Sequence, residues 1–452
     1  MREKIEKDKD GSHKDESHPD GFKPYLKLTF VIGLGFFTMG LMDPLYDTYL
    51  PIFLGKWISS MRTIGFIMTL DNIFAIMLIP IVSVWSDRTR TPIGRRMPFI
   101  LATLPLTAVF YSFIPYAAVA SLMALVVVVF FLNIFKQAAR GPVVALMPDI
   151  IPGDFRSEAN GVINTMGGIA TIVGTVALAR LMDVKIVLPI IGDTRDKLPF
   201  PLAGILVVIA TLLLFIFVRE KPESMAAVSQ EDAVKRTPFW ASLKTVARAQ
   251  DKSAIRILVS LFLWFLAYQG VLPWIGKYSI DKLGMSSGNA ALGAGMVGIA
   301  YAIFAIPSGY LAHKIGRKKA IRIALTALTL VLLALFFFLP FTSALGLSGL
   351  PRMIAFWAIL FVFGIFWVTV ITNSFPMLWQ MADHGTMGIY TGLYYTFSQA
   401  AAISAPPITG TLIDMAGYPA IFLFSAVCMT AACLTMAGVD KGEADPVVLK
   451  KR

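Results

Sequence analysis

The stretch "SDRTRTPIGRRMPF" (86–99) places four arginines in a short segment between two long apolar runs. A second segment, "HKIGRKKAIR" (313–322), carries five Lys or Arg between two further apolar runs. Gly94 and Gly316, each followed by two basic residues, are separated by close to half of the 452-residue chain. Two basic loops at this offset predict an internal duplication, in which each loop follows the second apolar run of its half.

Apolar runs long enough to cross a bilayer fill most of the chain. A hydrocarbon core about 30 Å thick needs about 20 mostly apolar residues in a helix. Such runs lie at about 28–54, 61–85, 97–118, 119–147, 160–182, 198–218, 255–276, 290–312, 321–341, 354–378, 389–413 and 419–438. With 56% hydrophobic and 15% charged residues, the sequence predicts an all-α polytopic membrane protein with twelve transmembrane helices in two six-helix halves.

Composition shifts divide the chain into five parts. We expect a disordered tail at 1–23, six-helix halves at 24–218 and 255–440, a linker at 219–254 and a second tail at 441–452. Within the linker, "FWASLKTVARA" could lie at the membrane surface as an amphipathic helix.

The basic loops and the linker fall on one side of this topology, so the positive-inside rule predicts cytoplasmic termini in a multi-pass protein of the cell (plasma) membrane. The net charge of +12 then reflects orientation and contact with lipid, and no nucleic-acid partner is expected.

Catalytic and metal-binding patterns are not found in the sequence. Cys428 and Cys433 both lie in the last apolar run, too few for a disulfide framework. The four histidines are scattered, and no carboxylate or cysteine stands at ligand spacing from them. We therefore expect no enzyme activity, no metal and no cofactor.

Charged residues inside the apolar runs are the main candidates for function. A charge at the bilayer centre costs about 2.5–3.5 kcal/mol on insertion scales, so such residues usually face water or a partner. Asp43 and Asp47 share one helix face on the first span, and Lys136 and Arg140 share one on the fourth.

We expect these four residues, with the neighbouring Tyr46 and Gln137, to form a charged wall that binds substrate. The alternative is that Asp47 is only solvated near the outer interface, with Lys136 and Arg140 as structural counterions.

Asp71, in "FIMTLDNIFAIMLIP" (66–80), lies near the middle of the second span with no base in its own helix. Such a carboxyl group could bind and release a proton or, with neighbouring oxygens, hold Na⁺. The alternative is a neutral acid hydrogen-bonded to a neighbouring helix. Asp71, Asp43 and Asp47 are thus the candidate cation-coupling residues.

Amides and aromatic rings at similar depth are candidate substrate contacts, because sugars stack their C–H faces on rings and hydrogen-bond through their hydroxyls. These residues are Asn164, Tyr268, Gln269, Trp367, Asn373, Trp379, Tyr394, Tyr395 and Gln399. Individually, such amides more often make helix–helix hydrogen bonds, and Trp and Tyr also gather at membrane interfaces.

The first basic loop also has a mechanical interpretation. Its candidate gating residues are Asp87, Arg88, Gly94, Arg95 and Arg96, and Arg317 belongs to the second loop. The segments "PVVALMPD" (142–149) and "PMLWQMAD" (376–383) share a Pro-x4-Met-x-Asp pattern that ends at Asp149 and Asp383. We expect a salt-bridge latch that closes the cytoplasmic side in one state; the alternative is a simple positive-inside loop.

Six plus six spans in a parallel repeat are typical of the major facilitator fold, with a substrate site near the midplane between the halves. The chain resembles the glycoside-pentoside-hexuronide:cation symporters, in the sucrose-transporter-like branch of the major facilitator superfamily. The resemblance covers all twelve spans and rests on "SDRTRTPIGRRMPFIL", "ARGPVVALMPDIIPGDFRSEANGVINTMGG" and "YTGLYYTFSQAAAISAPPITGTLID". It implies a monomer that takes up sugar with H⁺ or Na⁺, using carboxylates of the first half.

The melibiose-transporter relatives carry two carboxylates a helical turn apart on the second span and one on the fourth, and the corresponding positions here are Ala75, Ile79 and Arg140. This departure favours protons, with Asp71 as carrier and Asp43 paired with Lys136 or Arg140. The leading prediction is a proton-coupled symporter of a glycoside or oligosaccharide, working by alternating access. The alternatives are a sodium-coupled sugar symporter, a lysolipid or drug transporter on the same fold, and a non-transporting membrane sensor.

Overall fold

A computed structural model describes residues 22–152, 155–188, 192–220, 252–381 and 387–442. The helices of the first half are α1 (Lys23–Leu54), α2 (Met61–Met68), α3 (Leu70–Arg88), α4 (Met97–Ala120), α5 (Leu122–Ile150), α6 (Arg156–Ile172), the π-helix η2 (Val173–Leu178), the 3₁₀-helix η3 (Ala179–Asp183) and α7 (Pro199–Phe217). Those of the second half are α10 (Ser253–Leu283), α11 (Ser287–Ile315), α12 (Arg317–Phe336), α13 (Phe338–Ala344), α14 (Gly349–Trp379), α15 (Met387–Ala416) and α16 (Pro419–Ala437).

The predicted twelve membrane-crossing helices are confirmed. Eleven segments of the described chain are long and apolar enough to cross a bilayer, and α15 adds a twelfth long helix of 30 residues. The tails, "FWASLKTVARA" and Asp383 lie mostly or wholly outside the described residues, so those predictions stay open.

Two of the spans are interrupted. The second span is divided at Thr69 into α2 and α3, and the Thr69 hydroxyl donates to the Phe66 carbonyl oxygen (2.7 Å). The fifth span passes from α6 through η2 and η3. The break at Thr69 places Asp71 in the first turn of α3, where the positive end of the helix dipole favours a carboxylate.

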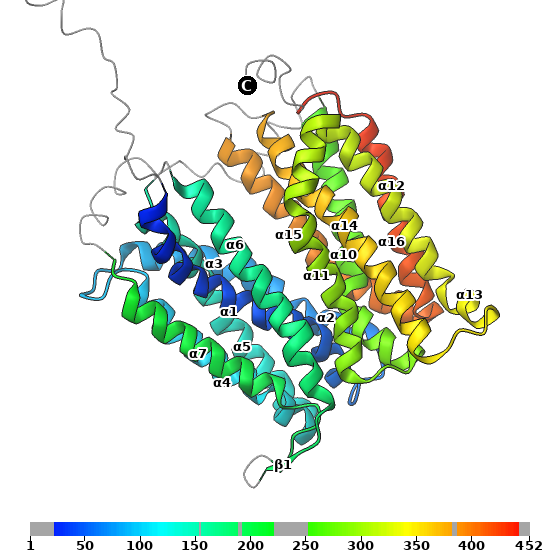
Figure 1. The fold of residues 1–452 in the computed structure, drawn as a ribbon, viewed down its shortest axis with the longest axis horizontal. Coiled ribbons are helices and arrows are strands. Elements are labelled where there is room, and N and C mark those ends of the chain that lie inside the picture. The colour runs from blue at the N-terminus through cyan, green and yellow to red at the C-terminus, as the bar shows by residue number, and fades with distance from the viewer. Residues whose placement is uncertain (1–21, 153–154, 189–191, 221–251, 382–386, 443–452) are drawn as a thin grey trace, which may run out of the picture.

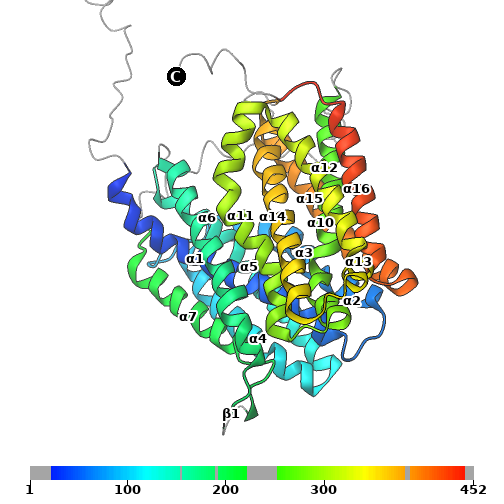
Figure 2. The same ribbon diagram turned by 45° about the vertical axis from the view of Figure 1, so that its right-hand side comes forward.

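The helices form two bundles, one of blue to green helices and one of green to red helices (Figure 1). In both views α11 lies between α6 and α14, at the boundary of the bundles (Figure 2). A small antiparallel hairpin of β1 (Val187–Leu188) and β2 (Gly192–Asp193) projects from one end. We call this the hairpin end, and the opposite end, with the loops at Gly94 and Gly316, the basic-loop end.

The two bundles touch closely at the hairpin end. A Cβ atom added to Gly65 of α2 would lie only 2.3 Å from the Pro406 carbonyl oxygen of α15. On α10, a Cβ at Gly276 would lie 2.7 Å from Thr48 Cγ2 of α1. Only glycine permits such an approach of two backbones, so the packing here is tight.

Toward the basic-loop end the two halves separate, as the facing sides of α11 and α6 show. A Cβ at Gly298 of α11 would lie 2.9 Å from Thr171 Cγ2 of α6, and Ala302 is still near α6 at Gly168 (3.7 Å). Ile306 and Tyr310, the next residues at four-residue spacing on that face of α11, are 85% and 76% exposed. The structure is therefore closed at the hairpin end and open toward the basic-loop end.

Candidate functional site

Three helices of the first half bring a lysine between two carboxylates. Lys136 Nζ of α5 lies 2.7 Å from Asp43 Oδ1 of α1, and 3.3 and 3.4 Å from the two carboxylate oxygens of Asp71 of α3. The Lys136 side chain is 6% exposed, whereas those of Asp43 and Asp71 are 34% and 19% exposed. The ammonium is thus enclosed while the acids remain partly accessible.

The depth of the cluster is close to mid-membrane. At about 1.5 Å per residue, Asp43, Asp71 and Lys136 lie about 16, 15 and 21 Å from the ends of their spans at the hairpin end. A hydrocarbon core is about 30 Å thick, so Asp43 and Asp71 reach its middle third and Lys136 lies just beyond it. Burying charge there is costly unless the charges are paired, and Lys136 supplies that pairing.

Amide and phenol groups surround the lysine. The Gln137 amide nitrogen donates to Asp71 Oδ1, and Asn133 Nδ2 donates to the Tyr46 hydroxyl (3.0 Å). Lys136 Nζ lies 4.8 Å from the centre of the Tyr46 ring, within range of a cation–π contact. Gln137 Oε1 and Asn133 Oδ1 are buried acceptors without a hydrogen-bond partner among the described residues.

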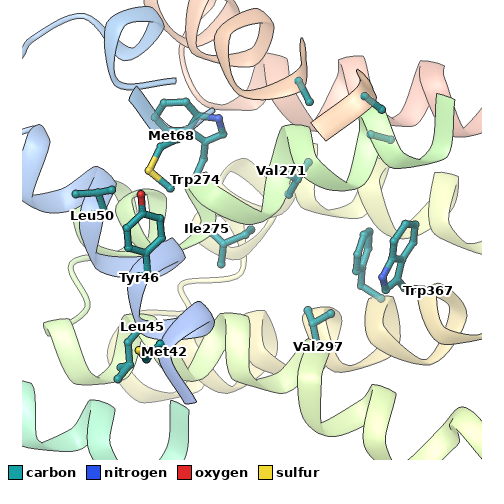
Figure 3. Close-up of a cluster of buried hydrophobic side chains, with 14 of the residues drawn as sticks. Met42, Leu45, Tyr46, Leu50, Met68, Val271, Trp274, Ile275, Val297 and Trp367 are labelled. Atoms are coloured by element: carbon teal, nitrogen blue, oxygen red, sulfur yellow. The ribbon is translucent and has the colours of Figure 1, made fainter. Parts of the chain in front are cut away.

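Apolar side chains close the cluster toward the hairpin end. Tyr46 packs in a buried group with Leu50 and Met68 of the first half and Trp274 and Ile275 of α10 (Figure 3). Tyr46 and Trp274 are 1% and 0% exposed. Contact between halves thus excludes water from this side of the cluster.

Asp47 adds a third carboxylate to the cluster. It is half-buried and makes no ion pair or hydrogen bond with the part of the chain that the structure describes. Asp43, Lys136 and Asp71 are its electrostatic neighbours in the first half, and Tyr268 of α10 in the second half lies within electrostatic range. Lys136 therefore pairs with two of the three carboxylates, and the third, that of Asp47, lies within electrostatic range of its ammonium group.

The structure adds a partner for Asp71 and removes one candidate base from this wall. Asp71 has no base in its own helix, but Lys136 reaches it from α5 as well as reaching Asp43. Arg140 is exposed and forms no ion pair within the described residues, so Lys136 alone is the base that Asp43 pairs with. The predicted Asp43–Lys136 pair is confirmed.

The second-half aromatics pack against one another. The rings of Tyr268 and Trp367 stack with centroids 3.9 Å apart and an interplanar angle of 5°, and the Phe265 ring meets Trp367 edge-on at 5.6 Å. Trp367 is only 4% exposed. The expectation that it offers an open face to a sugar is wrong for this conformation, because Tyr268 covers that face.

Two further candidates from the sequence are also internally satisfied. Asn373 is 3% exposed and its amide donates to the Thr369 carbonyl oxygen (2.8 Å). Tyr394 is 6% exposed, with its hydroxyl 3.3 Å from Ser374 Oγ.

Four polar candidates remain accessible. Gln269 and Gln399 are half-buried without a hydrogen bond to any described residue, and Tyr395 is 58% exposed. Asn164 is exposed and donates only to the Asn160 carbonyl oxygen of its own helix (2.8 Å). The Trp379 side chain lies outside what the structure describes.

A second charged network lies at the basic-loop end. Arg95 binds Asp149 through two contacts of 2.6 and 3.0 Å, and Arg96 Nε binds the same carboxylate at 2.9 Å. Arg96 also pairs with Asp87. Arg88 is exposed, and Arg317 is half-buried at the start of α12. The contacts of Arg95, Arg96 and Asp149 join α3, α5 and the start of α4 within the first half; among the described residues they do not bridge the halves in this conformation.

Glu220 is a member of this network that sequence reasoning missed. Its carboxylate accepts hydrogen bonds from the backbone N–H groups of Arg95 (2.8 Å), Arg96 (3.0 Å) and Met97 (2.8 Å), and so caps α4. Gly94 has φ +110°, and an added Cβ there would lie 2.5 Å from Glu220 Cδ. Gly94 therefore serves both the turn and the close approach of the cap.

We expect Glu220→Ala to destabilise the first half by about 1–2 kcal/mol, because it leaves three N–H groups at the start of α4 without an acceptor. Thermal unfolding of the purified protein in detergent would measure the change. Arg88→Ala, at an exposed position nearby, is the matched control and is expected to leave the midpoint unchanged. Equal midpoints for Glu220→Ala and the control would contradict the capping role.

The sequence profile of the Major Facilitator Superfamily matches residues 30–406, most of the chain. The chain belongs to the major facilitator superfamily. No curated protein sequence matches it. The cluster of Asp43, Asp71 and Lys136 thus lies on the first, second and fourth spans of a major facilitator, a fold whose substrate sites lie near the midplane between the halves.

Solved structures of major facilitators share the fold. A bacterial homologue of the iron transporter ferroportin, in an inward-facing state, is similar with a TM-score of 0.67 and 12% identity over 91% of this chain and 98% of that one. The nucleoside transporter NupG gives 0.67 and 13% identity, over 92% of this chain and 100% of NupG. The transporter FucP, in the outward conformation, gives 0.54 and 14%, over 92% and 99%.

These similarities are at the level of the fold. Membership of the major facilitator superfamily makes the protein a multi-pass membrane transporter and not an enzyme.

Proposed function

We propose that this major facilitator is a proton-coupled symporter of a sugar, a glycoside or an oligosaccharide, and that it works by alternating access. The observation that carries the proposal is the mid-membrane cluster in which Lys136 pairs with Asp43 and Asp71, while a third carboxylate, that of Asp47, lies within electrostatic range. A site with more acids than bases at this depth favours the uptake of a proton, because like charges in a poorly solvated site destabilise one another.

Asp47 is the carboxyl group that we assign to the proton. Asp43 and Asp71 already have Lys136 as partner, whereas Asp47 has no ion pair among the described residues and lies within electrostatic range of Tyr268 of the opposite half. A proton on Asp47 removes its repulsion of Asp43, one helical turn away. Binding of that proton is thereby linked to the boundary between the halves, where alternating access takes place.

Sodium coupling has less support from the geometry. Lys136 Nζ stands between Asp43 and Asp71, where a bound cation would otherwise bridge the two carboxylates. The positions that hold carboxylates in the melibiose-transporter relatives are Ala75, Ile79 and the exposed Arg140. The tethered ammonium thus takes the structural place of a metal ion.

The polar groups near the cluster favour a substrate rich in hydroxyls. Asn133 Oδ1 and Gln137 Oε1 are acceptors without partners in the described part of the chain, and Asp43 is partly accessible. The half-buried Gln269 and Gln399 would supply contacts from the second half. A sugar can donate to such oxygens and accept from amide N–H groups at the same time.

We further propose that the protein acts as a monomer in the plasma membrane, with the basic-loop end in the cytoplasm. The arginines and lysines at that end suit the cytoplasmic leaflet and its anionic lipids. In this orientation the structure corresponds to an inward-facing state, open at the basic-loop end. We also propose that residues 219–254 are the linker between the two halves, which rock against each other during transport.

Uptake by the purified protein in liposomes tests this function. A panel of labelled mono-, di- and oligosaccharides is offered under an imposed pH gradient, acid outside, with and without Na⁺. We expect one sugar class to accumulate with the pH gradient and independently of Na⁺. Accumulation that follows Na⁺ and ignores the pH gradient would reject proton coupling, and uptake of only a lysolipid or drug would reject the sugar.

A further inference from the structure

Two acidic side chains cap helix starts across the boundary between the halves. The Asp414 carboxylate of α15 accepts from the backbone N–H groups of Met61 (2.7 Å) and Arg62 (3.0 Å) and from Ser60 Oγ (2.9 Å), at the start of α2. The first N–H groups of a helix have no partner within the helix, so a carboxylate from outside satisfies them. Here that carboxylate belongs to the other half.

The reciprocal contact joins η3 to α11. The Asp183 carboxylate, at the end of η3, accepts from the Gly288 backbone N–H group (3.2 Å) and from Ser286 Oγ (2.7 Å). Ser286 in turn caps α11 by accepting from Asn289 N (3.4 Å), as Ser60 caps α2 by accepting from Thr63 N (3.3 Å). Each site therefore consists of a serine cap on one half and an aspartate from the other.

The duplication of the chain relates the two sites. The α2 helix begins the second span of the first half and α11 begins the second span of the second half, while Asp183 and Asp414 end the fifth span of each. The sequence repeats the pattern, with "LMD" at 181–183 and "LID" at 412–414. Equivalent residues of the two halves thus make equivalent contacts, each reaching across to the other half.

We propose that these two contacts, Asp414 with Ser60 and α2, and Asp183 with Ser286 and α11, form a paired latch that holds the transporter closed at the hairpin end. Opening that end separates α2 from α15 and η3 from α11 and therefore breaks both caps. The four carboxylate oxygens and their hydrogen-bond donors are then exposed to water. Asp183 and Asp414 are exposed, so water can replace the lost bonds. The latch is therefore weak enough to break in every cycle.

Close backbone packing stands beside each cap. A Cβ at Gly410 would lie 2.3 Å from the Met61 carbonyl oxygen, and one at Gly288 would lie 3.0 Å from the Ala179 carbonyl oxygen. The glycines allow the two helices of each pair to approach until the aspartate reaches the N–H groups. Formation of the two caps therefore depends directly on closure of the hairpin end.

Distance measurement between the halves tests the latch without a transported substrate, so its result is independent of the proposed sugar and proton. Spin labels are attached at Met123→Cys and Leu345→Cys, which are 72% and 58% exposed near the hairpin end, in a Cys428→Ala, Cys433→Ala background. Double electron–electron resonance on the full chain in lipid nanodiscs gives the populations of short and long distances. The closed state is the short one.

We expect Asp183→Ala or Asp414→Ala alone to raise the ratio of long to short distances about fivefold to tenfold, and the double variant to multiply the two effects. Asp193→Ala is the matched control, because this carboxylate also lies at the hairpin end but, among the described residues, accepts only from Arg195 N of its own half (3.0 Å). Asp183→Leu with Asp414→Leu keeps the side-chain size and removes every acceptor oxygen, and it replaces the alanine pair if that pair does not fold.

A double variant with the distance populations of the Asp193→Ala control would overturn the latch. If only one of the two single variants changed the ratio of long to short distances, the proposal that the two contacts act as a pair would be wrong.

Discussion

Lys136→Met abolishes accumulation of substrate against its gradient and destabilises the protein by about 3 kcal/mol. Methionine keeps the length of the side chain but removes the ammonium that Asp43 and Asp71 share. Breaking a buried ion pair by removing one partner costs about 3–5 kcal/mol, because the remaining charges stay poorly solvated. We place the effect at the lower end, since Asp43 is 34% exposed. Uptake in liposomes and thermal unfolding in detergent measure the two consequences.

A second buried lysine of the same protein provides a control for the Lys136→Met result. Lys277 is also mostly buried and pairs with Asp281 at 3.1 Å, but this pair lies near the hairpin end, on α10. We expect Lys277→Met to have a smaller effect on both measurements. Adding Asp71→Asn to Lys136→Met is expected to recover part of the lost stability, because one uncompensated carboxylate is removed. Normal accumulation by Lys136→Met would contradict the central role of the cluster.

Asp47→Asn separates transport from coupling. Asparagine cannot carry a proton, but it keeps the size and hydrogen-bonding capacity of the side chain, so the substrate contacts persist. We expect exchange of labelled for unlabelled substrate at a rate close to that of the unmodified protein, and no accumulation above the outside concentration under a pH gradient. The exchange rate is also expected to lose its dependence on pH.

Asp71→Asn is the comparison that decides between the two candidate carriers. It removes one partner of Lys136 and Gln137, so we expect it to slow exchange as well as accumulation. Asp47→Asn with normal accumulation, together with an Asp71→Asn variant that exchanges but does not accumulate, would transfer the proton to Asp71.

The sequence predicts the twelve helices because the length of an apolar run is a local property of the chain. It also predicts that Asp43 pairs with Lys136 or Arg140, since mid-span charges of opposite sign have few other partners in a membrane. It does not predict that Lys136 also reaches Asp71. That contact depends on how α3 packs against α5 and on the break at Thr69, neither of which a hydropathy pattern specifies.

Other features depend on contacts between distant residues. Glu220 lies at the start of a polar linker, and nothing in its neighbourhood indicates that it caps α4 at Arg95. The stacking of Tyr268 on Trp367 depends on ring orientations that only tertiary packing determines. Composition identifies both rings as candidates but does not say whether their faces are free.

Proton movement caused by the substrate itself is the most direct test of the account. Liposomes containing the protein and a trapped pH-sensitive dye are held without a pH gradient, and the sugar class identified by uptake is added outside. We expect the lumen to acidify with the unmodified protein, and not with Asp47→Asn, although that variant still exchanges the sugar. Sugar entry without acidification in the unmodified protein would contradict proton symport through the Asp43, Asp47, Asp71 and Lys136 cluster.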